Sequence, residues 1–229
     1  MKEETIKYYT DIEQNTPEWH LFKNANFSAS EFHKLVGAKG LTQGSMSYIE
    51  KKLGEFLSGT YDEVDSKAMA WGREHEPVAG RLLEKAMGVN LLQIGGITNS
   101  FYPNTVISPD RISETNFLNP DVFGVEIKCP MTLGNHACYI PLLDSSIKDK
   151  GSLLKKINSD YYWQVQGSML ISGIKQWYFV SYQPFFTAKK DLRLIVAKIE
   201  FNQKDCDLLA ERLEQANEVL NELIEIALR

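Results

Sequence analysis

Two acidic residues and a lysine near the middle of the chain have a spacing that suits metal-assisted hydrolysis. Asp110 precedes Glu126 by sixteen residues, and Lys128 follows two residues later. Segment 123–130 is expected to form a short strand, whose alternation turns Glu126 and Lys128 to the same side. Carboxylates bind hard cations such as Mg²⁺, and a cation at a phosphodiester activates water and neutralises developing charge. We therefore expect Asp110, Glu126 and the carbonyl of Ile127 to hold one or two cations, with Lys128 reaching the same water.

An ordinary hairpin with solvent-exposed acids and a lysine explains these three residues equally well, because such triplets are common by chance. Local details favour a functional site. The acid and the lysine share one face of a strand that is otherwise apolar. Pro109 immediately precedes Asp110, and Pro130 closes the strand.

A glutamate and a glutamine on two predicted helices are candidates to support this site. Glu76 falls on the apolar face of a helix expected over 66–87, where a carboxylate is costly unless something binds it. Gln164 lies in a helix expected over 160–171 and suits the positioning of DNA or water. The alternatives are a buried acid paired with a base such as Arg73 and an ordinary exposed glutamine.

A possible anion site lies nearer the N-terminus. Ser28 and Glu31 have the spacing of a capping box, which predicts a helix start at Ser28. The free N–H groups of a helix start bind phosphate, to which Ser30 adds a hydroxyl and Lys23 a positive charge. A plain N-cap without a ligand is the other interpretation.

The chain of 229 residues is long enough for one compact α/β domain, and we expect a single domain over 1–229. The other predicted helices are 17–23, 48–57 and a C-terminal helix at about 203–228, with a polar loop at 38–45 and a polar, lysine-rich segment at 141–158. The predicted strands are 91–95, 96–98, 102–108, 122–128, 177–182 and 192–199. The stretch over 113–121 is turn-rich, as a hairpin between 102–108 and 122–128 needs.

Charge and composition exclude several classes of protein. The net charge is −5, but residues 205–229 carry seven acids and two bases, so the other 204 residues are balanced. A local basic channel is therefore compatible with the composition. No stretch is apolar and long enough for a membrane span, and the polar N-terminus differs from a signal peptide, so we expect a cytoplasmic protein. Three cysteines cannot supply a Cys₄ cluster, and the four histidines lack zinc-ligand spacing.

Taken together, these motifs resemble those of the lambda exonuclease family, the YqaJ-type viral recombinase nucleases of the PD-(D/E)xK superfamily. The similarity runs through most of the chain, in matching order and spacing, and comprises Trp19-His20, 28–31, Met46-Ser47-Tyr48, Lys67-Ala68, 70–76, 108–110, 126–130 and 164–166. It implies a restriction-endonuclease-like core, in which helices flank a central mixed β-sheet.

The resemblance also implies an activity. Members of this family digest one strand of double-stranded DNA processively from a 5′ end with Mg²⁺, for which Mn²⁺ is expected to substitute. They leave a 3′ overhang for a single-strand annealing protein, and they form a ring-shaped homotrimer around the DNA. Carried over by motif, the catalytic and DNA-binding residues are Lys128, Glu126, Asp110, Glu76, Gln164, Lys23, Ser30, Ser108 and Lys67.

One position departs from the family pattern. The lambda enzyme has an arginine where this chain has Lys23, which would hold the 5′-phosphate together with Ser30 and Ser108. A lysine neutralises a phosphate but cannot bind it with two parallel hydrogen bonds. The strength of the preference for a phosphorylated 5′ end and the DNA contacts of loop 38–45 therefore do not follow from the resemblance.

Other functions stay open at this point. A related PD-(D/E)xK endonuclease or a structure-specific resolvase would use the same catalytic residues. A catalytically inactive clamp for DNA ends, which recruits a partner, belongs to a different class. The Cas4-like exonucleases of the superfamily bind an iron–sulfur cluster through four cysteines, and this chain has three.

Overall fold

A four-stranded sheet forms the centre of the structure, a computed structural model that describes residues 5–61, 66–114 and 119–229. Its strands, in spatial order, are β5 (Arg111–Ile112), β6 (Gly124–Lys128), β7 (Gln176–Tyr182) and β8 (Leu194–Glu200). β6 and β7 run parallel, and the two outer pairs are antiparallel. The expected mixed sheet is confirmed, and its longer strands are rich in β-branched and aromatic residues, which favour strands.

The two faces of the sheet belong to different hydrophobic clusters. Val125 and Ile127 pack in a smaller cluster on one face. Glu126 points to the other face, where its register partner Phe179 belongs to the main core. The alternation expected for segment 123–130 is therefore confirmed, and it places the acid on the side of the main core.

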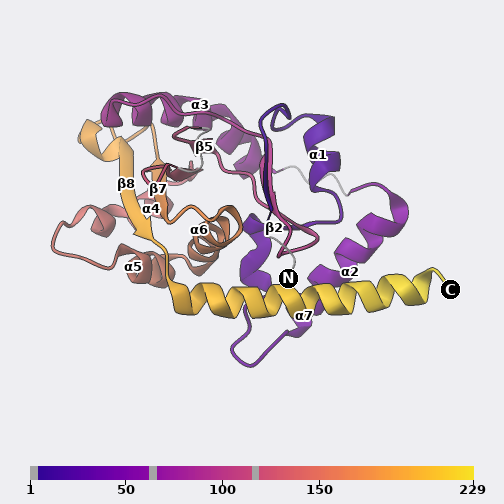
Figure 1. Cartoon of the computed structure of the whole chain (residues 1–229). Coiled ribbons are helices and arrows are strands. Elements are labelled where there is room, and N and C mark those ends of the chain that lie inside the picture. The colour runs from indigo at the N-terminus through magenta and orange to yellow at the C-terminus, as the bar shows by residue number, and fades with distance from the viewer. Residues whose placement is uncertain (1–4, 62–65, 115–118) are drawn as a thin grey trace.

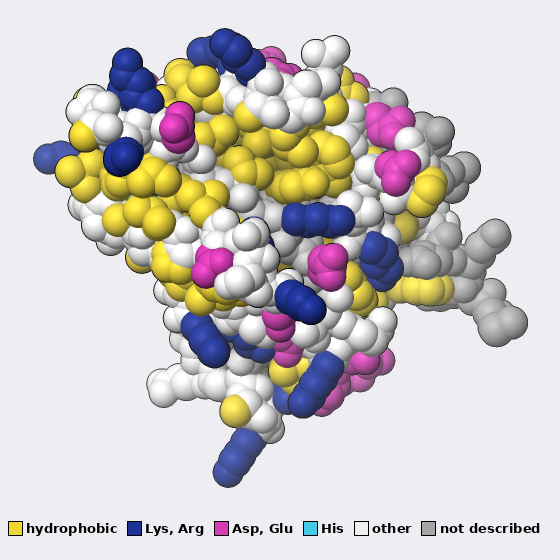
Figure 2. All heavy atoms as spheres, turned by 90° about the vertical axis from the view of Figure 1, so that its left-hand side faces the viewer, with side chains coloured by type: hydrophobic (Ala, Val, Ile, Leu, Met, Phe, Trp, Pro, Cys, Tyr) yellow, Lys and Arg dark blue, Asp and Glu magenta, His cyan; other side chains and the backbone are white. Residues whose placement is uncertain are grey.

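Helices cover both faces of the sheet (Figure 1). α3 (Lys67–Met87) packs on the side of the smaller cluster. α5 (Lys150–Ile157) and α6 (Ser159–Ser172) pack on the main core. Figure 2 shows hydrophobic side chains gathered on the side of the molecule where β8 and the end of α3 lie, in keeping with the partly buried residues of the smaller cluster, Val78, Met87, Phe123, Tyr178, Leu194 and Val196.

The N-terminal helices agree with the predictions except at one start. α1 (Pro17–Lys23) and α3 have nearly the expected bounds. α2 (Gln43–Ser58) begins five residues before the expected start, because Thr42 and Ser45 form a capping box. Part of the expected loop 38–45 therefore belongs to this helix.

The helix expected from Ser28 is a short 3₁₀ helix, η1 (Ala29–Lys34). Ser28 makes no side-chain capping bond there, and Glu31 pairs with Lys34. The predicted capping box is therefore wrong. A helix this short also has no extended dipole, so an anion site at this point has to rest on side chains.

Two small sheets join segments that are distant in sequence. β1 (Ile6–Tyr9) pairs with β3 (Gly96–Asn99), and β2 (Phe27–Ser28) pairs with β4 (Thr105–Val106). β1 and β2 were not expected.

The strand that pairs with β6 also differs from the prediction. Strand 102–108 was expected to form a hairpin with 122–128, but Pro109 separates it from β5, and β5 pairs with β6 instead. Residues 91–95 contribute only a bridge from Leu92 to Ile112 within the described ranges, and residues 115–118 of the expected turn lie outside them.

The parallel pair β6 and β7 needs a long crossover, and helices supply it. The lysine-rich segment 141–158 was not expected to be helical, but it contains α5, whose N-cap is Asp149. The crossover also includes α4 (Leu133–Ala137), η2 (Ile140–Leu143) and α6, and η3 (Lys190–Arg193) follows β7. α6 confirms the predicted helix 160–171.

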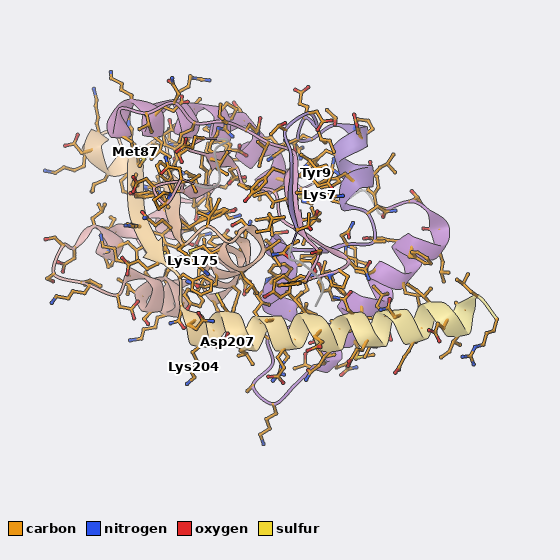
Figure 3. All side chains as sticks on the ribbon, in the orientation of Figure 1. Lys7, Tyr9, Met87, Lys175, Lys204 and Asp207 are labelled. Carbon is orange, nitrogen blue, oxygen red and sulfur yellow. The ribbon has the colours of Figure 1, made fainter. Side chains whose placement is uncertain are left out.

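The C-terminal helix α7 (Gln203–Ala227) lies along the edge of the molecule next to α2 and α6 (Figure 1). Its apolar residues are buried against the body as far as Leu220, and Leu223 and Ile224 are partly buried against the same core. Lys204 lies on the outer side of the helix (Figure 3). Within the described ranges, no helix combines the length and apolar composition that a membrane span needs.

Candidate active site

The two acids of the predicted cation site lie on neighbouring strands. β5 and β6 pair in the register Arg111–Val125, which puts Asp110 at the level of Glu126. The backbone N–H of Ile127 donates a hydrogen bond of 2.6 Å to Oδ2 of Asp110. This bond holds the Asp110 side chain against β6, so that both carboxylates face the same space.

Glu126 is the centre of a buried polar cluster. Its side chain is 2% exposed, and Oε1 accepts hydrogen bonds of 2.7 Å from Nζ of Lys128 and from Nε2 of Gln164. Gln164 comes from α6, which crosses the same face of the sheet, and it is 8% exposed. The alternative of an ordinary exposed glutamine is therefore wrong.

Glu76 reaches the site from α3. Its Oε1 accepts a hydrogen bond of 3.0 Å from Nη1 of Arg111. The same guanidinium also donates to the backbone carbonyl of Asp110. Glu76 is thus paired with a base, as the alternative interpretation supposed, and the base is Arg111. Arg111 was missed in the sequence, although it directly follows Asp110.

Tyr161 is a second residue that the sequence analysis missed. The ammonium of Lys128 lies 4.7 Å from the centre of its ring. Tyr161 and Gln164 are three residues apart on α6 and therefore face the same way. This spacing was a signal that could have identified Tyr161. The ring and the Glu126 carboxylate together fix where the Lys128 ammonium lies.

Burial and mutual repulsion shift the acid–base equilibria of the cluster. Burial, followed by the negative charge of Asp110, raises the pKa of Glu126 to about 8. The same two causes raise the pKa of Glu76 to about 7. Burial also raises the pKa of Asp110. Burial of Lys128 acts to lower its pKa, but the charges of Glu126 and Asp110 outweigh this effect and raise it. The site as a whole favours additional positive charge.

The oxygen atoms at this site fit a hard cation that takes some of its ligands from the protein and keeps some of its water. Within the described residues, no group of three or more His, Cys, Asp or Glu side chains is arranged to hold a metal ion. The protein ligands would therefore be the carboxylates of Asp110 and Glu126 and the carbonyl of Ile127. Mg²⁺ suits such a set, because it keeps several waters and is often held by one or two carboxylates.

A cavity of about 160 Å³ connects the predicted cation site to the predicted phosphate site. Five of its lining residues belong to the cluster around Glu126, namely Glu76, Asp110, Glu126, Lys128 and Gln164. Three others are predicted to bind the 5′-phosphate, namely Lys23, Ser30 and Ser108. The fold thus brings both groups of predicted residues to one space. A larger cleft of about 730 Å³, lined by Tyr139, Asn158 and Tyr161 among others, reaches Asp110 and Lys128 as well.

Lys23 is held at this cavity by an aromatic contact. Its ammonium lies 4.0 Å from the centre of the Trp19 ring. The indole N–H of Trp19 donates to the carbonyl of Gly95 at 2.8 Å and to Oγ of Ser108 at 3.2 Å. Burial and then the charge of Lys52 lower the pKa of Lys23 to about 8. An anion bound at this point would stabilise the charged form of Lys23 and would offset both effects on its pKa.

The remaining predicted contacts differ in position. Ser30 is exposed, and its hydroxyl lies 3.3 Å from that of Ser28. Ser108 is partly buried, and its hydroxyl donates to the carbonyl of Gly95 at 2.7 Å. Lys67 is exposed at the start of α3 and lines neither of the two cavities. The structure therefore does not bring Lys67 to the phosphate site.

Comparison with solved structures shows related folds. An alkaline exonuclease (LHK-Exo) from Laribacter hongkongensis has a TM-score of 0.75 at 22% identity, covering 93% of this chain and 96% of that chain. Its complex with dAMP has a TM-score of 0.72 at 21% identity, with the same coverage. A phage-related exonuclease from Haemophilus somnus 129PT has a TM-score of 0.65 at 18% identity, covering 88% and 96%. The predicted fold class, a restriction-endonuclease-like α/β core, is confirmed.

Comparison with curated proteins gives no match. The model of a protein family, however, matches most of the chain. The YqaJ-like viral recombinase domain is found over residues 18–175, a range that includes the carboxylate cluster, Lys128, Gln164 and the cavity with Lys23. This chain belongs to the YqaJ-like viral recombinase family.

Proposed function

We propose that this protein is a Mg²⁺-dependent exonuclease that digests one strand of linear double-stranded DNA in the 5′→3′ direction and leaves 3′ single-stranded overhangs. Its family and its fold support a nuclease of the lambda exonuclease kind. The main observation behind the proposal is that one cavity joins the Glu126 cluster to Lys23, Ser30 and Ser108. A hydrolytic site and a site for a terminal phosphate thus lie side by side.

Each residue of the cluster has a distinct part in the proposed reaction. Asp110, Glu126 and the Ile127 carbonyl would hold Mg²⁺, or Mn²⁺ in its place, and the cation supplies an activated water and neutralises charge on the phosphate. Lys128, held by Glu126 and Tyr161, would donate to the attacking oxygen or to the phosphate. Its raised pKa keeps it protonated at neutral pH.

Gln164 and Glu76 would act through their neighbours. The amide of Gln164 orients the Glu126 carboxylate by the hydrogen bond to Oε1. Glu76, fixed by Arg111, faces the same cavity and would position water there. Both residues are positioning residues in this proposal.

Recognition of the 5′ end would take place at the other end of the cavity. Lys23 would supply the positive charge, and the hydroxyl of Ser30 would donate to a phosphate oxygen. Ser108 would do the same by giving up its hydrogen bond to the carbonyl of Gly95. Lys67, exposed at the start of α3, would contact DNA farther from the end.

Assembly and partners complete the proposal. A ring-shaped homotrimer around the duplex would keep the enzyme on its substrate, since a body with balanced charge gives little non-specific affinity for DNA. The 3′ strand would pass to a single-strand annealing protein in the cytoplasm of a bacterial or phage-infected cell. The mass of the particle in solution tests the trimer.

Digestion of end-labelled duplexes tests the reaction. With Mg²⁺ and a 5′-phosphate, the 5′ label is expected to appear early as mononucleotide, while the 3′ label stays in long products. Early release of the 3′ label would contradict the direction. Cutting of closed circular duplex would favour the endonuclease or resolvase alternative, and binding of ends without hydrolysis would favour the inactive clamp.

A further inference from the structure

Lys52 is a buried lysine that lines the same space as the partly buried Lys23 of the proposed phosphate site. Lys23 and Ser30 line the cavity that reaches Glu126, and they also line a neighbouring cavity of about 460 Å³. Lys52 and Glu55 of α2 belong to the lining of that second cavity. One cavity is therefore lined by Lys23 from α1 and by Lys52 from α2.

Lys52 is fixed in position more firmly than a surface lysine. It is 5% exposed, and its ammonium lies 2.8 Å from Oε2 of Glu55. The same carboxylate oxygen accepts a hydrogen bond of 2.9 Å from the backbone N–H of Ala25, two residues after Lys23. Glu55 therefore ties Lys52 to the turn that follows α1.

The pair with Glu55 leaves Lys52 able to bind an anion. An ammonium has three N–H donors, and Glu55 is the carboxylate that it contacts within the described ranges. Lys52 can thus keep Glu55 and donate to a second acceptor at the same time. The lining of the cavity also includes two further basic residues, Lys51 and Arg73, and two carboxylates, Glu31 and Glu55.

The ammonium groups of Lys23 and Lys52 repel each other across this cavity, although Glu55 pairs with Lys52. The charge of Lys52 is felt at Lys23, where it is the largest effect of a charged neighbour on that ammonium. A terminal phosphate carries up to two negative charges and accepts hydrogen bonds from several directions. Lysines on α1 and α2 would approach it from different sides, which compensates for the single-point contact that each lysine makes.

We infer that Lys52 is a second residue that binds the 5′-phosphate of the DNA end, together with Lys23. This inference rests on the proposed function, since it assigns a residue to the phosphate site of the exonuclease. It predicts that recognition of the phosphate is shared between α1 and α2, with Glu55 holding Lys52 in place.

The test compares duplexes with a 5′-phosphate and with a 5′-hydroxyl. Lys52→Met keeps the length of the side chain and removes the charge. It is expected to lower kcat/KM on the phosphorylated duplex by about tenfold or more, and on the hydroxyl duplex by less than about twofold. Lys155→Met is the matched control, because Lys155 is also ion-paired, with Asp205 at 2.7 Å, but lies outside both cavities. The control should keep the wild-type ratio.

The variants separate binding from folding. Lys52→Met leaves Glu55 without its closest cation. The double variant Lys52→Met/Glu55→Gln removes that unpaired charge, and it should show the same loss of preference for the phosphorylated duplex. Lys52→Arg should retain the preference. If wild type prefers the phosphate and both Lys52→Met proteins keep that ratio, the inference is overturned while the proposed function stands. If wild type shows no preference, the proposed phosphate site itself fails.

Discussion

The side-chain amide of Gln164 donates a hydrogen bond of 2.7 Å to Oε1 of Glu126, which lies 38 positions earlier in the chain. The bond joins α6 to β6 inside the main core, and the same oxygen accepts the ammonium of Lys128. The orientation of a proposed cation ligand therefore depends on a helix that supplies no ligand itself. α6 also carries Tyr161, so it fixes the positions of both the carboxylate and the lysine.

Replacement of Gln164 tests this dependence. Gln164→Leu removes the donor at nearly the same volume, and we expect kcat to fall by about 10- to 100-fold, the effect of a lost hydrogen bond to a charged group. Gln166→Leu is the control on the same helix, because the Gln166 amide bonds the carbonyl of Glu200 and the N–H of Asn202, away from the site. The control should lower the melting temperature and keep kcat. An equal loss of kcat in both variants would show a general effect on folding.

The features that could be predicted are those encoded within a few residues. The alternation of β6 places Glu126 opposite Val125 and Ile127, and the observed faces agree. The burial of Gln164 could not be predicted in this way. Ten of the fourteen residues of α6 are buried, so the helix lacks the contrast between polar and apolar faces from which a direction is read.

Pairing between segments that are distant in the chain also could not be predicted from the sequence. β2 has two residues and was not expected. A strand over 102–108 was expected, but no local pattern indicates that Thr105–Val106 within it pairs with β2. Lys52 has the same difficulty. Its helix was predicted, but its place beside Lys23 depends on how α1 and α2 meet, which Glu55 and the turn at Ala25 determine.

Binding of Mg²⁺ should be visible as stabilisation of the folded protein. A ligand that binds only the native state raises the melting temperature, and we expect saturating Mg²⁺ to raise it by about 2–4 °C. Glu126→Gln should abolish this shift, because it replaces one of the two carboxylates. Glu74→Gln, an exposed acid on α3, should keep it. An equal Mg²⁺ shift in the Glu126 variant, measured by differential scanning fluorimetry, would contradict the assignment of that ligand.

The preference for a 5′-phosphate should weaken at alkaline pH. The pKa of Lys23 is lowered to about 8, first by burial and then by Lys52. A lysine is charged below its pKa, so Lys23 in the free enzyme is charged at pH 7 and largely neutral at pH 9. Since kcat/KM reports the free enzyme and the free substrate, the ratio of kcat/KM for phosphate over hydroxyl ends should decline above about pH 8, well above the second ionisation of the phosphate at about pH 6.

Lys23→Arg provides the control for this pH dependence. An arginine stays charged over the whole range, so the ratio for the variant should not decline up to about pH 9. Effects of pH on the hydrolytic cluster act on both substrates and cancel in the ratio. A wild-type ratio that rises between about pH 8 and pH 9, or a variant that declines in parallel with wild type, would show that another group controls recognition of the end.

The position of β6 depends on a glycine at its start. A Cβ atom on Gly124 would lie 2.4 Å from the ring of the buried Trp177, so Gly124→Ala overfills the core and should cost about 1–3 kcal/mol of the free energy of unfolding. We also expect kcat to fall, because Glu126 and Lys128 move with the strand. Gly134→Ala, at a position in α4 where an added Cβ would meet no described atom within 4 Å, should lower neither quantity. Urea unfolding and kcat on the same preparations decide the matter: wild-type values of both for Gly124→Ala would show that this contact does not hold the strand.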